Sequence, residues 1–157
     1  MLSHKYSLWI LKSINLHFAG LLNRHVYYEG ANRDTESLSE WFEVRIDGPS
    51  IKQLTRGQFR ANVEVNILCI AVNGPNRMYL LRQMLAEAAE AMKTDILIKR
   101  YGDINEDPDN DRSLIGCLEL LKTPKDDIDI AYFGRVQPQT EMQQGSAEAR
   151  YRIYLGV

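Results

Sequence analysis

The sequence predicts a mixed α+β fold, in which an N-terminal helix and one long central helix pack against a mainly antiparallel sheet. Apolar residues recur every three or four positions in two segments, which is the spacing of a helix with one buried face. Elsewhere apolar and polar residues alternate, as in strands with one solvated face. A chain of 157 residues is long enough to bury one core, so we expect a single domain over residues 1–157.

The first helix is predicted from Ser7 to about Arg24. Ser7 has the side chain of an N-cap residue. Lys12 interrupts the apolar run, which is also shorter than the roughly 20 residues that cross a bilayer. We therefore expect a retained helix rather than a signal peptide, and no membrane contact. Its two rows of side chains are Leu8, Leu11, Asn15, Phe18 and Leu22, and Ile10, Ile14, His17 and Leu21.

Two strands are predicted next. Residues alternate from Trp41 to Asp47, and Gly48 and Pro49 are expected to end that strand. The clearest alternation in the chain runs from Gln58 to Val72. The segment between them is expected to be a basic loop, and a long helix is expected from Met78 to Met92.

The last third of the chain predicts four more strands. Ile96 to Tyr101 is a short one, and Leu114–Leu121 and Ile128–Phe133 are expected to form a hairpin. Arg150 to Val157 alternates and must be held in the sheet. The polar stretch Gln137–Ala149 is expected to be a long loop, and loops of this length are usually functional or disordered.

The charges and motifs exclude several functions. With 19 basic and 21 acidic residues the net charge is -2, which argues against a protein that mainly binds phosphates. The sequence contains no P-loop, G-x-S-x-G or G-x-G-x-x-G pattern. Cys69 and Cys117 lie in apolar runs as expected free thiols, and the three histidines lack metal-ligand spacing. We expect no catalytic residue, no metal ion and no cofactor.

An acidic segment follows the predicted strand Ile96–Tyr101. Its start resembles a calcium loop, but the sixth and twelfth positions hold Pro108 and Leu114 instead of glycine and glutamate. A solvated acidic loop is the simpler interpretation. If it faced a channel that carries DNA, its carboxylates would repel phosphates and ease passage. The candidate lumen-facing residues are Asp103, Glu106, Asp107, Asp109 and Asp111.

Several residues are candidates for contact with a partner. Lys52, Arg56 and Arg60 surround Phe59, which is typical either of a nucleic-acid patch or of a loop that docks on a protein. The alternation places Trp41 on the polar face of its strand, so we expect it to be an exposed aromatic of a contact surface. In the long polar stretch the candidates are Gln139, Met142 and Gln143.

The order of elements, with Trp41–Ile46 and Ala61–Ile67 as strands ahead of a long helix, resembles the tail terminator proteins of tailed bacteriophages. The resemblance covers most of the chain. It implies a subunit of a hexameric ring that sits on the last ring of the tail tube, stops polymerisation and meets the neck. The implied partners are further copies of the chain, the tube protein, a neck or stopper protein and, where the tail has one, the sheath protein. The implied location is the virion, after assembly in the host cytoplasm.

The size of the chain fits such a ring. A compact subunit of this length is roughly 40 Å across, so six touching subunits leave a hole of similar width, through which genomic DNA could pass without specific binding. Within the ring, the acidic segment is expected to line the lumen, and the segment from Lys52 to Arg60 is expected to contact the tube or the neck.

The sequence is also compatible with two other functions. The nearer alternative is another neck component, such as a head-tail stopper or a tail-completion protein. The distant alternative is a small-ligand-binding or enzymatic α+β domain, which would need a pocket with convergent polar groups.

Overall fold

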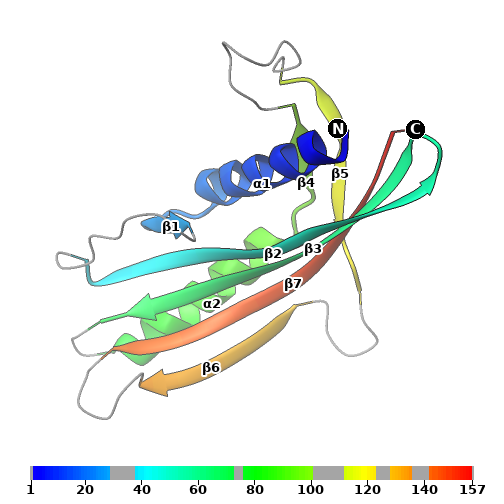
Figure 1. Ribbon diagram of the computed structural model, residues 1–157. Helices are drawn as coiled ribbons and strands as arrows, with labels where there is room; N and C mark the ends of the chain where they lie inside the picture. Colours follow the sequence, from blue (N-terminus) through cyan, green and yellow to red (C-terminus); the bar gives the residue numbers. More distant parts are fainter. Residues whose placement is uncertain are drawn as a thin grey trace.

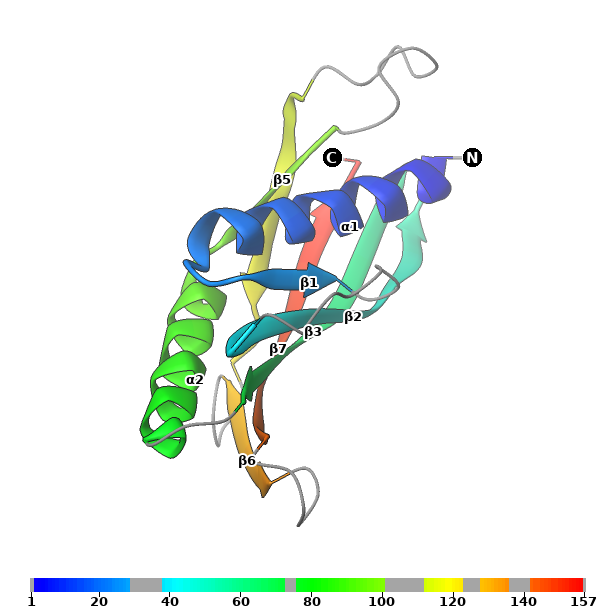
Figure 2. The same ribbon diagram turned by 90° about the vertical axis from the view of Figure 1, so that its left-hand side faces the viewer.

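In the computed structural model, the described residues are 2–28, 38–72, 76–100, 112–122, 128–135 and 142–156. Within these ranges, two helices lie on one face of a seven-stranded, mostly antiparallel sheet (Figures 1 and 2). This arrangement confirms the predicted mixed α+β class. The elements are α1 (Leu2–Leu21), β1 (Val26–Tyr28), β2 (Glu40–Thr55), β3 (Gln58–Ala71), α2 (Arg77–Lys93), β4 (Ile96–Lys99), β5 (Leu114–Leu120), β6 (Asp129–Arg135) and β7 (Gln143–Leu155).

The sheet is built around three long strands. β2 and β3 form an antiparallel hairpin whose register runs from Glu40 opposite Ala71 to Thr55 opposite Gln58. β7 runs antiparallel to β3 along nearly the whole of that strand. The strand order is β1-β2-β3-β7-β5-β4, with β6 also paired to β7 and β1 parallel to β2.

The prediction that the first strand ends at Asp47 is wrong. β2 continues through Gly48 and Pro49 to Thr55, and the register shift between Asp47 and Ser50 gives β2 one residue more than β3 at this point. Gly48 has a φ of 98°, a backbone conformation that favours glycine. The basic segment expected as a loop is therefore the end of a long hairpin. We call residues 50–60 the hairpin tip.

The strands β5 and β6 exist, but the predicted hairpin between them is wrong. Both pair with β7, β5 near Tyr151 and β6 along the first half of the strand. The predicted loop Gln137–Ala149 is also wrong from Gln143 onward, because β7 begins there. Glycine is needed at position 145 of β7 because α2 packs closely there. A Cβ added at Gly145 would lie only 3.0 Å from a methyl of Leu85.

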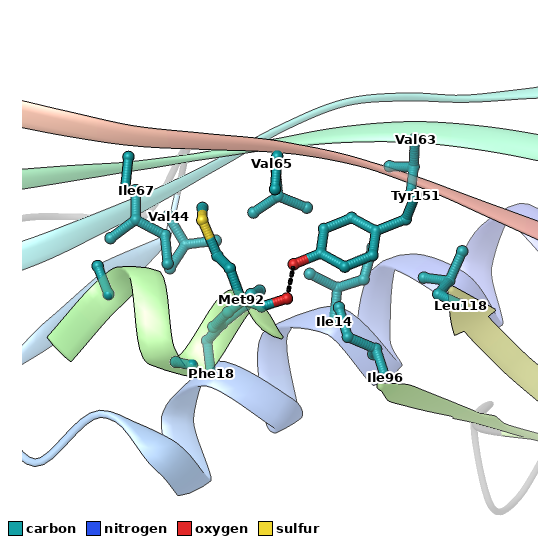
Figure 3. Close-up of a cluster of buried hydrophobic side chains, with 14 of the residues drawn as sticks. Ile14, Phe18, Val44, Val63, Val65, Ile67, Met92, Ile96, Leu118 and Tyr151 are labelled. Carbon is teal, nitrogen blue, oxygen red and sulfur yellow. Dashed lines mark hydrogen bonds between the residues drawn. The ribbon is translucent and has the colours of Figure 1, made fainter. Parts of the chain in front are cut away.

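The core lies between the two helices and the inner face of the sheet (Figure 3). Ile14 and Phe18 of α1 and Met92 of α2 are fully buried there, as their helical spacing predicts. Tyr151 of β7 lies among them, and its hydroxyl donates a hydrogen bond of 2.7 Å to the carbonyl oxygen of Met92. A single side chain thus joins the sheet to the last turn of α2.

Arg24 connects three parts of the fold after the end of α1. Its Nε and Nη2 donate to the two carboxylate oxygens of Glu87 on α2, at 3.1 and 3.2 Å. Its Nη1 donates to Glu40 at the start of β2, at 3.3 Å. Arg77 of α2 reaches the other oxygen of Glu40, at 3.4 Å. This forked geometry is available to arginine and not to lysine.

Arg24→Ala is expected to lower the free energy of unfolding by about 1–2 kcal/mol, because charged hydrogen bonds are lost at a half-buried site. Arg24→Lys keeps the charge without the fork and is expected to recover only part of this loss. Urea unfolding followed by circular dichroism measures both. An Arg24→Ala effect within the roughly 0.5 kcal/mol of ordinary surface substitutions would show that the network adds no stability.

Candidate assembly surfaces

The hairpin tip is an exposed basic segment. It carries Lys52, Arg56 and Arg60 and no acidic residue. The side chains from Lys52 to Gln58 are all exposed, including the apolar Leu54. Figure 1 shows the tip at the end of the sheet where β7 finishes, next to the N-terminal end of α1. The structure therefore leaves Lys52 and Arg56 accessible to a partner.

Phe59 and Arg60, at the base of the tip, are less accessible than the sequence suggests. The ring of Phe59 packs edge-on against Tyr6 of α1, with 5.7 Å between the ring centroids. Arg60 is half-buried, and its Nε has no hydrogen-bond partner among the described residues. Phe59 thus fixes the hairpin against the first helix instead of offering a free aromatic platform.

The prediction that Trp41 is an exposed aromatic is wrong. The alternation correctly places it on the face of the sheet opposite the helices, which we call the outer face. There it is only 4% exposed, because Leu68 and Ile70 of β3 and the partly buried Met142 pack around it. The apolar run that follows Ile67 was the signal that the outer face is covered at this end.

Trp41→Ala is expected to destabilise the protein by about 3 kcal/mol, since it removes a buried aromatic side chain. The matched control Lys52→Ala, on the same strand but exposed, is expected to change stability by less than about 0.5 kcal/mol. Chemical denaturation of the two variants gives the comparison. Equal stabilities would mean that Trp41 is not buried and would restore its assignment to a contact surface.

The other predicted contact residues lie near β6 or outside the described ranges. Met142 belongs to the cluster around Trp41, and the Gln143 side-chain oxygen accepts a 2.7 Å hydrogen bond from the hydroxyl of Tyr132. Gln139 lies outside the described residues. The same holds for the acidic segment: Asp103, Glu106, Asp107, Asp109 and Asp111.

The structure reveals an apolar surface that the sequence did not predict. Met78 and Tyr79, at the start of α2, and Ile130, Tyr132 and Phe133, on β6, are all at least 40% exposed. The guanidinium of Arg82 lies over the Tyr132 ring, 5.1 Å from its centroid. Aromatic side chains, methionine and arginine are the residues enriched in protein interfaces. We call these six residues the α2–β6 surface.

The edge of β6 adds to this surface. Within the described ranges β6 pairs with β7 alone, so its other edge presents unpaired backbone groups. An open edge strand with exposed apolar side chains is a site at which another chain can bind. The sequence signal was present in Ile128–Phe133, where apolar side chains fall on both faces of one strand.

The centre of the outer face is charged and hollowed. Two neighbouring grooves of about 420 and 340 Å³ lie over β2, β3 and β7. The larger groove is lined by Arg45, Ile46, Asp47, Glu64, Asn66 and Glu148. No helix covers this face in the described part of the chain (Figure 2).

Burial shifts the pKa values of both cysteine thiols and of His17. Burial raises the pKa of the Cys69 thiol to about 12, and burial together with Asp95 and Glu119 raises the pKa of Cys117. Both thiols therefore stay protonated near neutral pH. Burial also lowers the pKa of His17, which contacts the carbonyl oxygen of Ala91 at 3.3 Å. Among the described residues, no three His, Cys, Asp or Glu side chains gather closely enough to hold a metal ion.

Comparisons with known proteins reveal a similar fold but no activity. No family model and no curated protein matches this sequence. One solved structure, of a protein with no functional name, is 13% identical and superimposes with a TM-score of 0.50 over 91% of this chain and 94% of the other. At this identity the likeness concerns the fold alone. In the described ranges, no helix has the length and apolar character needed to span a bilayer.

Proposed function

We propose that this chain is a structural protein of a tailed bacteriophage. In this proposal it forms a hexameric ring on the last ring of the tail tube, ends tube polymerisation and joins the tail to the neck. The observation that carries the proposal is the presence of two different exposed surfaces at opposite ends of one sheet. The hairpin tip lies beside the Leu155 end of β7, and the α2–β6 surface lies beside its Gln143 end.

Two unlike surfaces are what a ring requires. A head-to-tail ring joins one patch of each subunit to a different patch of the next, whereas a two-fold dimer uses the same patch twice. The 13 residues of β7 separate the two surfaces by roughly 40 Å at the rise of an extended strand. The α2–β6 surface is apolar and has an open strand edge, which suits a permanent contact between subunits.

We assign the basic hairpin tip and the acidic segment roles that follow from their charge. The basic tip, with Lys52 and Arg56, contacts the tube or the neck protein, and a sheath protein where the tail has one. The acidic segment from Asp103 to Asp111 lines the lumen and keeps passing DNA from sticking by repelling phosphates. The two helices, with Arg77–Lys93 as the central one, hold the sheet rigid behind these surfaces.

Immunogold microscopy of phage particles tests this location. Antibodies raised against the purified chain are expected to label a single point on each particle, where the tail meets the head, and one end of headless tails. An antibody against the tube protein serves as the control and should not share this single-point pattern. Label spread along the whole tail, or unlabelled particles, would rule the proposal out.

A further inference from the structure

Three segments that meet at one end of the sheet carry basic residues and no acidic residue. They are α1, the hairpin tip and residues 151–155 at the end of β7. Figure 1 shows the tip next to the end of β7 and the N-terminal end of α1. The basic residues of the three segments are Lys5, Lys12, Lys52, Arg56, Arg60 and Arg152.

The basic side chains of the tip lack counter-charges within the chain. Lys52 lies directly opposite Arg60 in the register of β2 and β3, and like charges in such cross-strand positions are unfavourable. Neither they nor Arg56 form an ion pair with a described residue. Arg152, one row further along the sheet, differs because it lies opposite Glu119 on β5. The unpaired charge is therefore confined to the tip.

Exposed apolar surface accompanies these charges. Leu54, near the turn, is 43% exposed. Tyr154 of β7 lies directly opposite Arg60 and is 55% exposed. Tyrosine and arginine are the residues that most often anchor protein interfaces. A phosphate backbone would have no use for the leucine, and the net charge of -2 opposes binding to a long polyanion. The tip is thus better suited to a protein than to a nucleic acid.

We infer that the hairpin tip docks on an acidic protein surface. Carboxylates of the partner pair with Lys52, Arg56 and Arg60, and the partner packs on Leu54 and Tyr154. Arginine binds carboxylates through two parallel hydrogen bonds, and the absence of acidic residues from α1 extends the attractive field around the tip. The inference rests on the proposed function, which places the tip against the tube or the neck protein, and it adds the chemistry of that partner.

Charge reversal at the tip tests this partner in the phage. A phage that lacks the gene is supplied with Lys52→Glu plus Arg56→Glu, and plaque titre is counted. We expect a titre at least about tenfold below that given by the wild-type chain, because the tip then repels an acidic surface. Revertants selected on this variant are expected to have lost or reversed an acidic residue of another virion protein. Such a suppressor identifies a protein partner, since mutation cannot change the charge of DNA phosphates.

The matched control is Lys93→Glu with Lys122→Glu, which makes the same change of net charge at exposed positions outside the three basic segments. It is expected to complement like the wild type. Circular dichroism checks that both variants fold. Should the tip variant fail to fold, Lys52→Gln with Arg56→Gln replaces it and is expected to lower the titre in the same direction.

A DNA duplex serves as the competing probe. The purified wild-type chain is mixed with a labelled duplex at physiological salt and is expected to leave its electrophoretic mobility unchanged. Binding that the tip variant loses would overturn the inference in favour of a nucleic-acid partner.

Two results in the phage would also overturn the inference: full titre with the tip variant, or suppressors confined to the gene itself. Both leave the gene essential, so the proposed function would survive them. A phage that forms plaques normally without the gene would instead reject the proposed function, and the tube or neck contact that rests on it would be rejected too.

Discussion

Truncating Tyr151 to alanine is expected to lower the free energy of unfolding by about 3–5 kcal/mol, the range for large aromatic side chains in cores. Tyr151 is fully buried, and Figure 3 shows it between Ile14 and Leu118 with its hydroxyl on the carbonyl oxygen of Met92. Its loss leaves a cavity between the sheet and the helices and removes the hydrogen bond at the end of α2. Urea unfolding at neutral pH measures the change.

Tyr151→Phe separates packing from hydrogen bonding. It keeps the ring, so the expected loss is only about 1–2 kcal/mol, from the carbonyl oxygen that loses its donor. If both variants were equally stable, the ring would contribute nothing and the described core would be incorrect.

The same side chain gives a pH dependence of known sign. Burial raises the pKa of Tyr151 in the folded protein above its ordinary value of about 10. The folded state therefore holds this proton when the unfolded chain releases it, and its contribution to stability is lost as the pH rises above about 10. Tyr151→Phe is expected to reduce the loss of stability between neutral and strongly alkaline pH. A parallel decline in both proteins would contradict this assignment.

Placing charges on the α2–β6 surface is expected to abolish tail completion without unfolding the subunit. In Ile130→Asp with Phe133→Asp, both replaced side chains are more than half exposed in the single chain, so stability should change by less than about 1 kcal/mol. At the centre of an interface, each lost anchor costs about 2 kcal/mol or more, so the loss of both should weaken subunit association by roughly a thousandfold.

Complementation measures this effect. A phage that lacks the gene is supplied with either the wild-type chain or the variant, and plaque titre is counted. The matched control is Leu97→Asp with Leu114→Asp, two apolar positions of similar exposure on β4 and β5. Normal titre with the β6 variant, or an equal loss with the control, would show that the α2–β6 surface is not the contact between subunits.

The sequence predicts those elements whose periodicity reflects a single buried face. Alternation along β3 and helical spacing along α2 both arise from one apolar face, and both elements fall where the patterns place them. Residue type alone does not reveal the first half of β7, because Gly145 and Ser146 favour turns and loops. That segment is a strand because β3 pairs with it on one side and β6 on the other. Pairing between distant segments is not encoded in local spacing.

The sequence predicts some of the candidate contact residues correctly and others wrongly, because contacts between distant segments decide which side chains are exposed. Lys52 and Arg56 are accessible as expected, because charged residues near a turn tend to remain in solvent. Trp41 was misplaced since its burial depends on Leu68 and Ile70, which lie opposite or beside it only through the register of β2 and β3. The α2–β6 surface depends on the packing of a helix beside a strand some 50 residues away, which no motif records.

Tail length in a phage that lacks this gene is the most direct measure of the central proposal. Lysates are imaged by electron microscopy and the lengths of all tails are recorded, with the complemented phage as control. A terminator predicts overlong tubes without heads, because the tube grows without its stop. Tails of normal length that fail to join filled heads would contradict a terminator and indicate another neck component, and normal infectious particles would contradict any role in the tail.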